Sequence, residues 1–137
     1  MPFFTNSEEL YEVLKLLFSR IGENDPGAAR AISRSRLLMR LRLSSPSAIV
    51  TFNGRQDPLE IFYGASTLRP DIELDMPADM LHQILLSELP LKKAVASGKM
   101  KVRGPFLKAF VFGDIFRSGQ ALYPQILEGL DRNRNRN

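Results

Sequence analysis

Few side chains in this sequence could carry out acid–base or metal chemistry. His82 is the single imidazole, and Asp79 lies three residues before it. On a helix this spacing places both side chains on one face, where they could form an acid–base pair or two metal ligands. The same spacing also occurs without any functional site, when a surface or half-buried histidine lies beside an acid in the first turn of a helix. Because no third ligand stands at a suitable spacing, we favour the second interpretation and expect no enzyme activity, no metal and no cofactor.

Charged residues form two further patterns. Glu73 and Asp75 alternate with apolar residues, so they occupy one side of a strand, which we interpret as its solvated side. An arginine-rich stretch could bind the phosphates of nucleic acid or anionic lipid. We interpret it as a solvated face, because no aromatic residue lies between Phe18 and Phe52. The stretch comprises Arg30, Arg34, Arg36, Arg40 and Arg42.

The most unusual segment is rich in phenylalanine and spans residues 106–116. Four of the nine phenylalanines fall within these eleven residues. On a helix the apolar side chains would cover most of the circumference, with Lys108 and Asp114 as the chief exceptions. Such a helix must contact something on at least two sides. It is either sandwiched between a sheet and the last helix, or it lines a ligand cavity or docks on a membrane.

Hydrophobic periodicity predicts the elements that must position these groups. Helices are expected over residues 7–22, from residue 26, over 77–86, 90–97 and 106–117, and again after a break at Gly119. Strands are expected over residues 37–43, 48–52, 59–63, 71–76 and 99–103. The first four strands predict an antiparallel meander, and the helical crossover before the fifth favours a parallel pairing. The fold class is therefore α+β, with a five-stranded, mostly antiparallel sheet covered by helices.

Length and charge set the limits of the domain. The chain has 137 residues, which predicts a single domain over residues 1–130. The polar repeat over residues 131–137 predicts a disordered tail. The whole chain has a net charge of +4, but three of its arginines, Arg132, Arg134 and Arg136, lie in this repeat. Residues 1–131 hold 16 basic and 15 acidic residues, a net charge of +1. The basic balance therefore does not favour a nucleic-acid partner.

Several classes of protein are excluded or disfavoured by composition. The sequence contains no cysteine, so it has no disulfide, thiolate nucleophile or cysteine-ligated metal. It has no stretch of about 18 consecutive apolar residues and no positively charged segment before an apolar one at its start. These features predict a cytoplasmic protein.

Two stretches resemble the sterol-carrier-protein domain family, namely residues 71–82 and 89–104. The most specific part is Ser97–Gly104, in which Lys99, Lys101 and Gly104 form a Lys-x-Lys-x-x-Gly pattern. The resemblance covers about Leu37 to Phe116. It implies a hydrophobic tunnel between a five-stranded sheet and its helices, with the segment 106–116 as a wall of the tunnel.

The resemblance implies non-enzymatic binding or transfer of a fatty acid, acyl-CoA, sterol or other lipid. The alternative is an accessory domain of a larger lipid- or quinone-related system with no ligand of its own. A lipid is the expected partner, and transient contact with a membrane surface or a homodimer is compatible with both interpretations. The candidate ligand-binding residues are Leu81, Ile84, Leu85, Phe106, Phe110, Phe112, Ile115 and Phe116.

Overall fold

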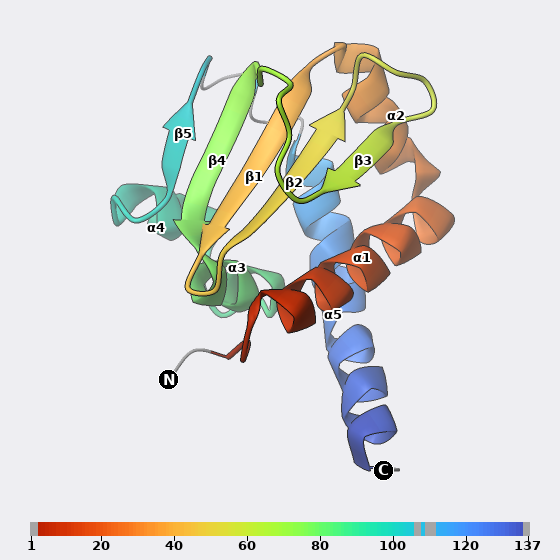
Figure 1. The fold of residues 1–137 in the computed structure, drawn as a ribbon, viewed down its shortest axis with the longest axis vertical. Coiled ribbons are helices and arrows are strands. Elements are labelled where there is room, and N and C mark those ends of the chain that lie inside the picture. The colour runs from red at the N-terminus through yellow and green to blue at the C-terminus, as the bar shows by residue number, and fades with distance from the viewer. Residues whose placement is uncertain (1–2, 106–107, 109–111, 136–137) are drawn as a thin grey trace.

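The structure is a computed structural model that describes residues 3–105, 108 and 112–135 (Figure 1). The elements of this part of the chain follow one another as helix, helix, four strands, helix, helix, strand and helix. They are α1 (Ser7–Asn24), α2 (Pro26–Ser35), β1 (Leu38–Ser44), β2 (Ala48–Asn53), β3 (Glu60–Tyr63), β4 (Ile72–Pro77), α3 (Ala78–Leu85), α4 (Leu91–Ala96), β5 (Lys101–Arg103) and α5 (Phe112–Asn135).

The five described strands form one mixed sheet in the order β3-β2-β1-β4-β5. The pairs β1–β2, β2–β3 and β4–β5 are antiparallel, and β1 and β4 are parallel, with Leu41 opposite Leu74. The α+β class and the mostly antiparallel sheet are thereby confirmed. The predicted four-stranded meander is wrong, and so is the parallel pairing of the fifth strand. The side chains of β1 are mostly buried, which suits a central strand, whereas β3 is half exposed and suits an edge.

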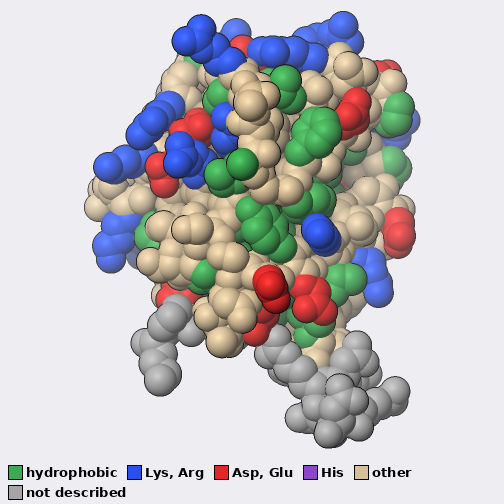
Figure 2. All heavy atoms as spheres, viewed as in Figure 1, with side chains coloured by type: hydrophobic (Ala, Val, Ile, Leu, Met, Phe, Trp, Pro, Cys, Tyr) green, Lys and Arg blue, Asp and Glu red, His purple; other side chains and the backbone are tan. Residues whose placement is uncertain are grey.

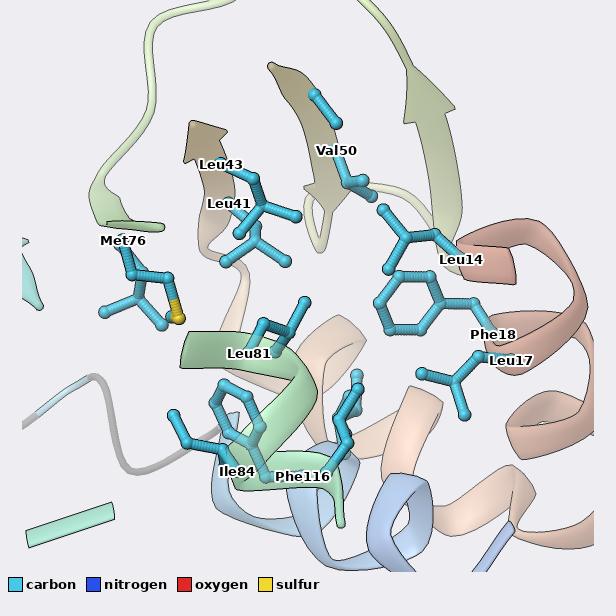
Figure 3. Packing of buried hydrophobic residues seen from close by; sticks show 14 of the residues in the cluster. Leu14, Leu17, Phe18, Leu41, Leu43, Val50, Met76, Leu81, Ile84 and Phe116 are labelled. Carbon is cyan, nitrogen blue, oxygen red and sulfur yellow. The ribbon is translucent and has the colours of Figure 1, made fainter. Parts of the chain in front are cut away.

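The helices gather on one face of the sheet, and residues 64–71 cross the other face (Figure 1). Inward-facing side chains of the strands, among them Leu41, Val50 and Met76, share one hydrophobic core with the apolar stripe of α1 (Figure 3). That stripe follows the 3.6-residue period of a helix. Its buried members are Leu10, Val13, Leu14, Leu17, Phe18 and Ile21.

Helix α5 differs from its prediction in two ways. It is continuous through Gly119, where we expected a break. A glycine inside a helix costs only about 1 kcal/mol relative to alanine, and here it allows close packing, because a Cβ at residue 119 would lie 2.9 Å from Leu85 Cδ2. The helix also continues to Asn135, past residue 130, where we expected the domain to end. Extending an existing helix costs far less free energy than starting one.

Candidate ligand cavity

A small, partly open cavity of about 20 Å³ lies between the inner face of the sheet and three helices. Each of the four walls contributes two apolar side chains. They are Leu17 and Phe18 from α1, Leu41 and Phe52 from the sheet, Leu81 and Leu85 from α3, and Ile115 and Phe116 from α5. Figure 3 shows Leu17, Phe18, Leu41, Leu81 and Phe116 converging from these elements.

Regular secondary structure positions these side chains. Leu41 and Phe52 belong to the inward-facing set of neighbouring antiparallel strands, because alternate residues of a strand point to the same face. Leu81 and Leu85 are four residues apart and therefore share one face of α3. The rings of Phe18 and Phe52 meet edge to face, with centroids 5.0 Å apart and an interplanar angle of 89°. This contact fixes α1 against the sheet at the rim of the cavity.

The size and lining of the cavity limit what it holds without rearrangement. A volume of about 20 Å³ only slightly exceeds the roughly 10–15 Å³ that one water molecule needs. Water also needs polar partners, and an apolar void of this kind stays dry. An alkyl chain therefore enters only if some of the lining side chains move.

Four of the predicted ligand-binding residues line the cavity, namely Leu81, Leu85, Ile115 and Phe116. Ile84 is fully buried in the same core but is not among the lining residues. Phe106 and Phe110 lie outside the described residues, and Phe112 is the first residue of α5. The binding role of these eight residues stays a prediction.

Sequence reasoning missed the other half of the lining: Leu17, Phe18, Leu41 and Phe52. Helical and strand periodicity mark all four as core residues. Neither pattern states which core residues surround a void.

No family model matches the sequence, and neither does any curated protein. Solved structures do match. The sterol carrier protein domain 2 of Helicoverpa armigera has a TM-score of 0.63 and 16% identity, over 82% of this chain and 88% of its own. This chain has the sterol carrier protein 2 fold. The resemblance inferred from residues 71–104 is confirmed at the level of the fold.

Two further solved structures share the sterol carrier protein 2 fold. Palmitated SCP2L2 from Aedes aegypti has a TM-score of 0.57 and 17% identity, over 76% of this chain and 90% of its own. The ubiquinone synthesis protein UbiJ-SCP2 has a TM-score of 0.57 and 16% identity, over 88% of this chain and 94% of its own.

His82 and Asp79 each make a structural contact within this fold. His82 Nδ1 lies 2.7 Å from the hydroxyl oxygen of Tyr123, and the ring of Phe3 stacks on the imidazole at a centroid distance of 3.6 Å. Asp79 Oδ1 accepts a hydrogen bond of 2.9 Å from the backbone N–H of Phe3. Burial lowers the pKa of His82, against the opposing effect of Glu88 and Asp79. Both side chains thus hold the start of the chain against α3.

Among the described residues, no group of three or more His, Cys, Asp or Glu side chains could hold a metal ion. No described helix has the length and apolar character needed to cross a membrane.

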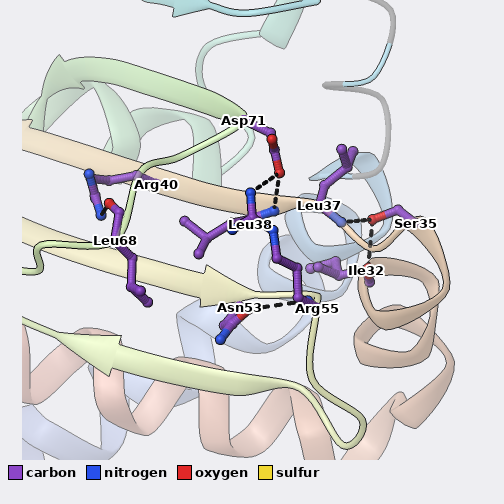
Figure 4. A network of polar contacts seen from close by, with 9 residues as sticks. All are labelled: Ile32, Ser35, Leu37, Leu38, Arg40, Asn53, Arg55, Leu68 and Asp71. Atoms are coloured by element: carbon purple, nitrogen blue, oxygen red, sulfur yellow. Dashed lines mark hydrogen bonds and ion pairs between the residues drawn. The ribbon is translucent and has the colours of Figure 1, made fainter.

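The arginine-rich stretch divides between two parts of the sterol carrier protein 2 fold. Arg30 and Arg34 are exposed on α2, whereas Arg40 and Arg42 belong to β1. Arg40 is not solvated as predicted, because its side chain is only 11% exposed. Its guanidinium donates hydrogen bonds to Thr51 Oγ1 at 3.2 Å and to the Leu68 carbonyl at 2.5 Å. It thereby fastens the segment that crosses the outer face of the sheet, which Figure 4 shows beside the Asp71 contacts.

Glu73 also differs from the prediction of a solvated carboxylate. Its side chain is 9% exposed and lies near three guanidinium groups, those of Arg40, Arg42 and Arg103. The parallel β1–β4 register places Glu73 directly opposite Arg40, and β5 places Arg103 on the other side of Glu73. A buried carboxylate needs such compensation.

Proposed function

We propose that this chain binds a hydrophobic ligand with an alkyl or acyl chain between the sheet and helices α1, α3 and α5, and that it catalyses no reaction on it. The observation that carries the proposal is the small, wholly apolar cavity to which all four walls contribute. Ligand sites are typically concave and mostly apolar. The palmitated structure that shares this fold supports a fatty acyl chain as the first ligand to test.

Burial of apolar surface would supply the binding free energy. Each buried CH₂ contributes about 0.8 kcal/mol, so eight of them contribute about 6 kcal/mol before the cost of rearrangement. The ligand must enlarge a cavity of about 20 Å³, so part of this free energy opposes the displacement of lining side chains.

The α5 wall is the part that we expect to move. Leu41 and Phe52 belong to hydrogen-bonded central strands, whereas Ile115 and Phe116 lie near the beginning of α5. Helix ends open at a lower free-energy cost than central strands. Displacement of Phe116 would remove a whole ring from the cavity wall.

Two measurements on the purified chain test the proposal. Native mass spectrometry should detect a bound lipid or bind added palmitate, and palmitate should displace a fluorescent fatty acid. Ile115→Phe should fill the cavity and weaken fatty-acid binding at least about tenfold. Leu16→Phe is the matched control, because Leu16 lies on α1 and is 39% exposed. Equal binding by both folded variants would place the ligand elsewhere.

A second candidate is an accessory domain without its own ligand. The small size of the cavity favours it, because the lining side chains already fill nearly all of the core. The likeness to UbiJ-SCP2, a ubiquinone synthesis protein, points in the same direction. Absence of both copurified lipid and fatty-acid displacement would favour this candidate over ligand binding.

A further inference from the structure

The outer face of the sheet carries a cluster of charged side chains that the proposed function does not use. Figure 2 shows Lys and Arg side chains gathered over the β4–β5 side of this face, with a few acidic side chains among them. At the centre of the cluster is Glu73 on β4. Arg40, Arg42 and Arg103 approach it from the two neighbouring strands.

The distances show that the three arginines do not have equal roles. Arg40 is buried, and its guanidinium already donates hydrogen bonds to Thr51 and Leu68. Its Nη1 lies 4.0 Å from Glu73 Oε2. Arg40 therefore has a structural role beneath the surface.

Arg42 and Arg103 are the exposed members of the cluster. Their Nη1 atoms each lie 3.7 Å from the same oxygen, Glu73 Oε1, and their side chains are 49% and 66% exposed. Both distances exceed that of a hydrogen bond. In the part of the chain that the structure describes, neither guanidinium has a hydrogen-bond acceptor from the protein. Two guanidinium groups thus converge on one point with donors still available.

The charges of the cluster do not cancel. Three guanidinium groups surround one carboxylate, which leaves an excess of two positive charges. The next row of the same face adds Asp75, opposite Arg42 on β1 and Lys101 on β5. The charges of Asp75 and Lys101 offset each other, and Arg42 is already counted, so the excess of two positive charges remains.

We propose that Arg42 and Arg103 form a binding site for a phosphate group, above Glu73 on the outer face of the sheet. The planar fork of a guanidinium matches two oxygens of a phosphate, and two such forks can hold one phosphate from opposite sides. A phosphate carries one to two negative charges near neutral pH, which matches the excess of the cluster. The phosphate belongs to a free phosphate compound or to a lipid headgroup.

The phosphate site is independent of the proposed function. It lies on the face of the sheet opposite the apolar cavity, so phosphate binding and fatty-acid binding can fail separately. Fatty-acid displacement is measured in solution without phosphate.

The experiment uses inorganic phosphate as the first probe and vesicles as the second. Backbone amide NMR shifts at low ionic strength should report saturable phosphate binding around β1, β4 and β5. Cosedimentation with phosphatidylcholine vesicles, with and without phosphatidic acid, tests the headgroup. Saturation by inorganic phosphate without vesicle binding assigns the site to a free phosphate compound, and preferential binding to phosphatidic acid assigns it to a lipid headgroup.

A double variant and its matched control locate the site. Arg42→Gln/Arg103→Gln should weaken binding at least about tenfold; Arg40 stays beside Glu73 in this variant, and circular dichroism confirms that it is folded. Arg30→Gln/Arg34→Gln removes the same charge from the exposed face of α2 and should change binding less than about twofold. Equal weakening by both pairs would overturn the proposal, because net charge alone would then explain binding. Absence of saturable binding to either probe would overturn it as well.

Glu73→Gln provides a test in the opposite direction. It removes the carboxylate that competes with the bound anion, so phosphate should bind several-fold more tightly. Circular dichroism confirms that the variant is folded before the titration. Weaker binding by the folded variant would contradict the charge argument.

Discussion

Replacing Gly119 with alanine tests whether the side chains that line the apolar cavity can move. A Cβ at this position in α5 would lie 2.9 Å from Leu85 Cδ2, 3.8 Å from Ile21 Cδ1 and 3.9 Å from Leu17 Cδ1. Only the first distance is shorter than ordinary van der Waals contact. Leu85 is the side chain that must move, and it lines the cavity.

Two opposing effects determine how much Gly119→Ala changes the free energy of unfolding. Alanine is favoured over glycine inside a helix by about 1 kcal/mol. Overpacking a core usually costs about 1–3 kcal/mol. Because the end of Leu85 can turn into the adjacent void, we expect a cost near the lower limit. Gly119→Ala should therefore change the free energy of unfolding by less than about 1 kcal/mol in either direction.

Gly129→Ala is the matched control on the same helix. A Cβ at residue 129 meets no atom within 4 Å, so this variant should show the helical gain of up to about 1 kcal/mol without a packing cost. The difference between the two variants then measures the cost of moving Leu85. Urea unfolding followed by circular dichroism gives both free energies, provided that the m-values agree.

Two results would refute this reasoning. If Gly119→Ala is less stable than Gly129→Ala by more than about 3 kcal/mol, Leu85 does not move into the cavity. A rigid Leu85 would also weaken the case for a ligand that enlarges the cavity. If both variants gain equally, α5 does not pack closely against Leu85.

Three further predictions concern polar contacts. Hydrogen bonding from the Leu38 N–H and then from Arg55 lowers the pKa of Asp71 below 3.8, so stability should be lost as pH falls from about 4 through that lowered pKa. Asp71→Asn should make the free energy of unfolding depend less steeply on pH in this range, and an unchanged dependence would contradict this role of Asp71. Burial lowers the pKa of His82 below 6.5, so the folded chain binds fewer protons than the unfolded chain and stability should fall as pH drops from 7 through this lowered pKa. An NMR titration of this single imidazole that gives 6.5 or more would refute the assignment. Tyr123→Phe removes the hydroxyl near His82 Nδ1 and should cost about 1–3 kcal/mol in urea unfolding, whereas a neutral effect would mean that water replaces the hydroxyl.

Local patterns predicted most elements but not their partners. The alternation of Ile72, Leu74 and Met76 identified β4 and its buried side. Alternation does not encode which strand lies alongside, and the parallel pairing with β1 depends on the burial of the whole sheet. The same gap explains the error at Glu73. Its three arginines lie on two other strands, Arg40 and Arg42 on β1 and Arg103 on β5, so the sequence of β4 alone predicts a solvated carboxylate.

Only part of the candidate site could be predicted, because local patterns do not show how distant elements pack together. Leu81 and Leu85 follow from the apolar face of α3 and from the family resemblance. Strand alternation predicts that Phe52 is buried, but its contact with Phe18 depends on how α1 crosses the sheet. Gly119 was interpreted as a helix break because glycine is a weak helix former. The tight fit against Leu85 is a tertiary effect that propensity does not contain.

The packing of α1 against α5 has a consequence for biosynthesis. These helices contact each other, although residues 25–111 lie between them in the chain. The apolar stripe of α1 leaves the ribosome first and stays incompletely covered until α5 has followed it. At about 5–20 residues per second this interval lasts roughly 4–18 seconds. During that time the nascent chain exposes side chains of α1 that later line the cavity, so a chaperone or an early lipid has its best access before α5 has been synthesised.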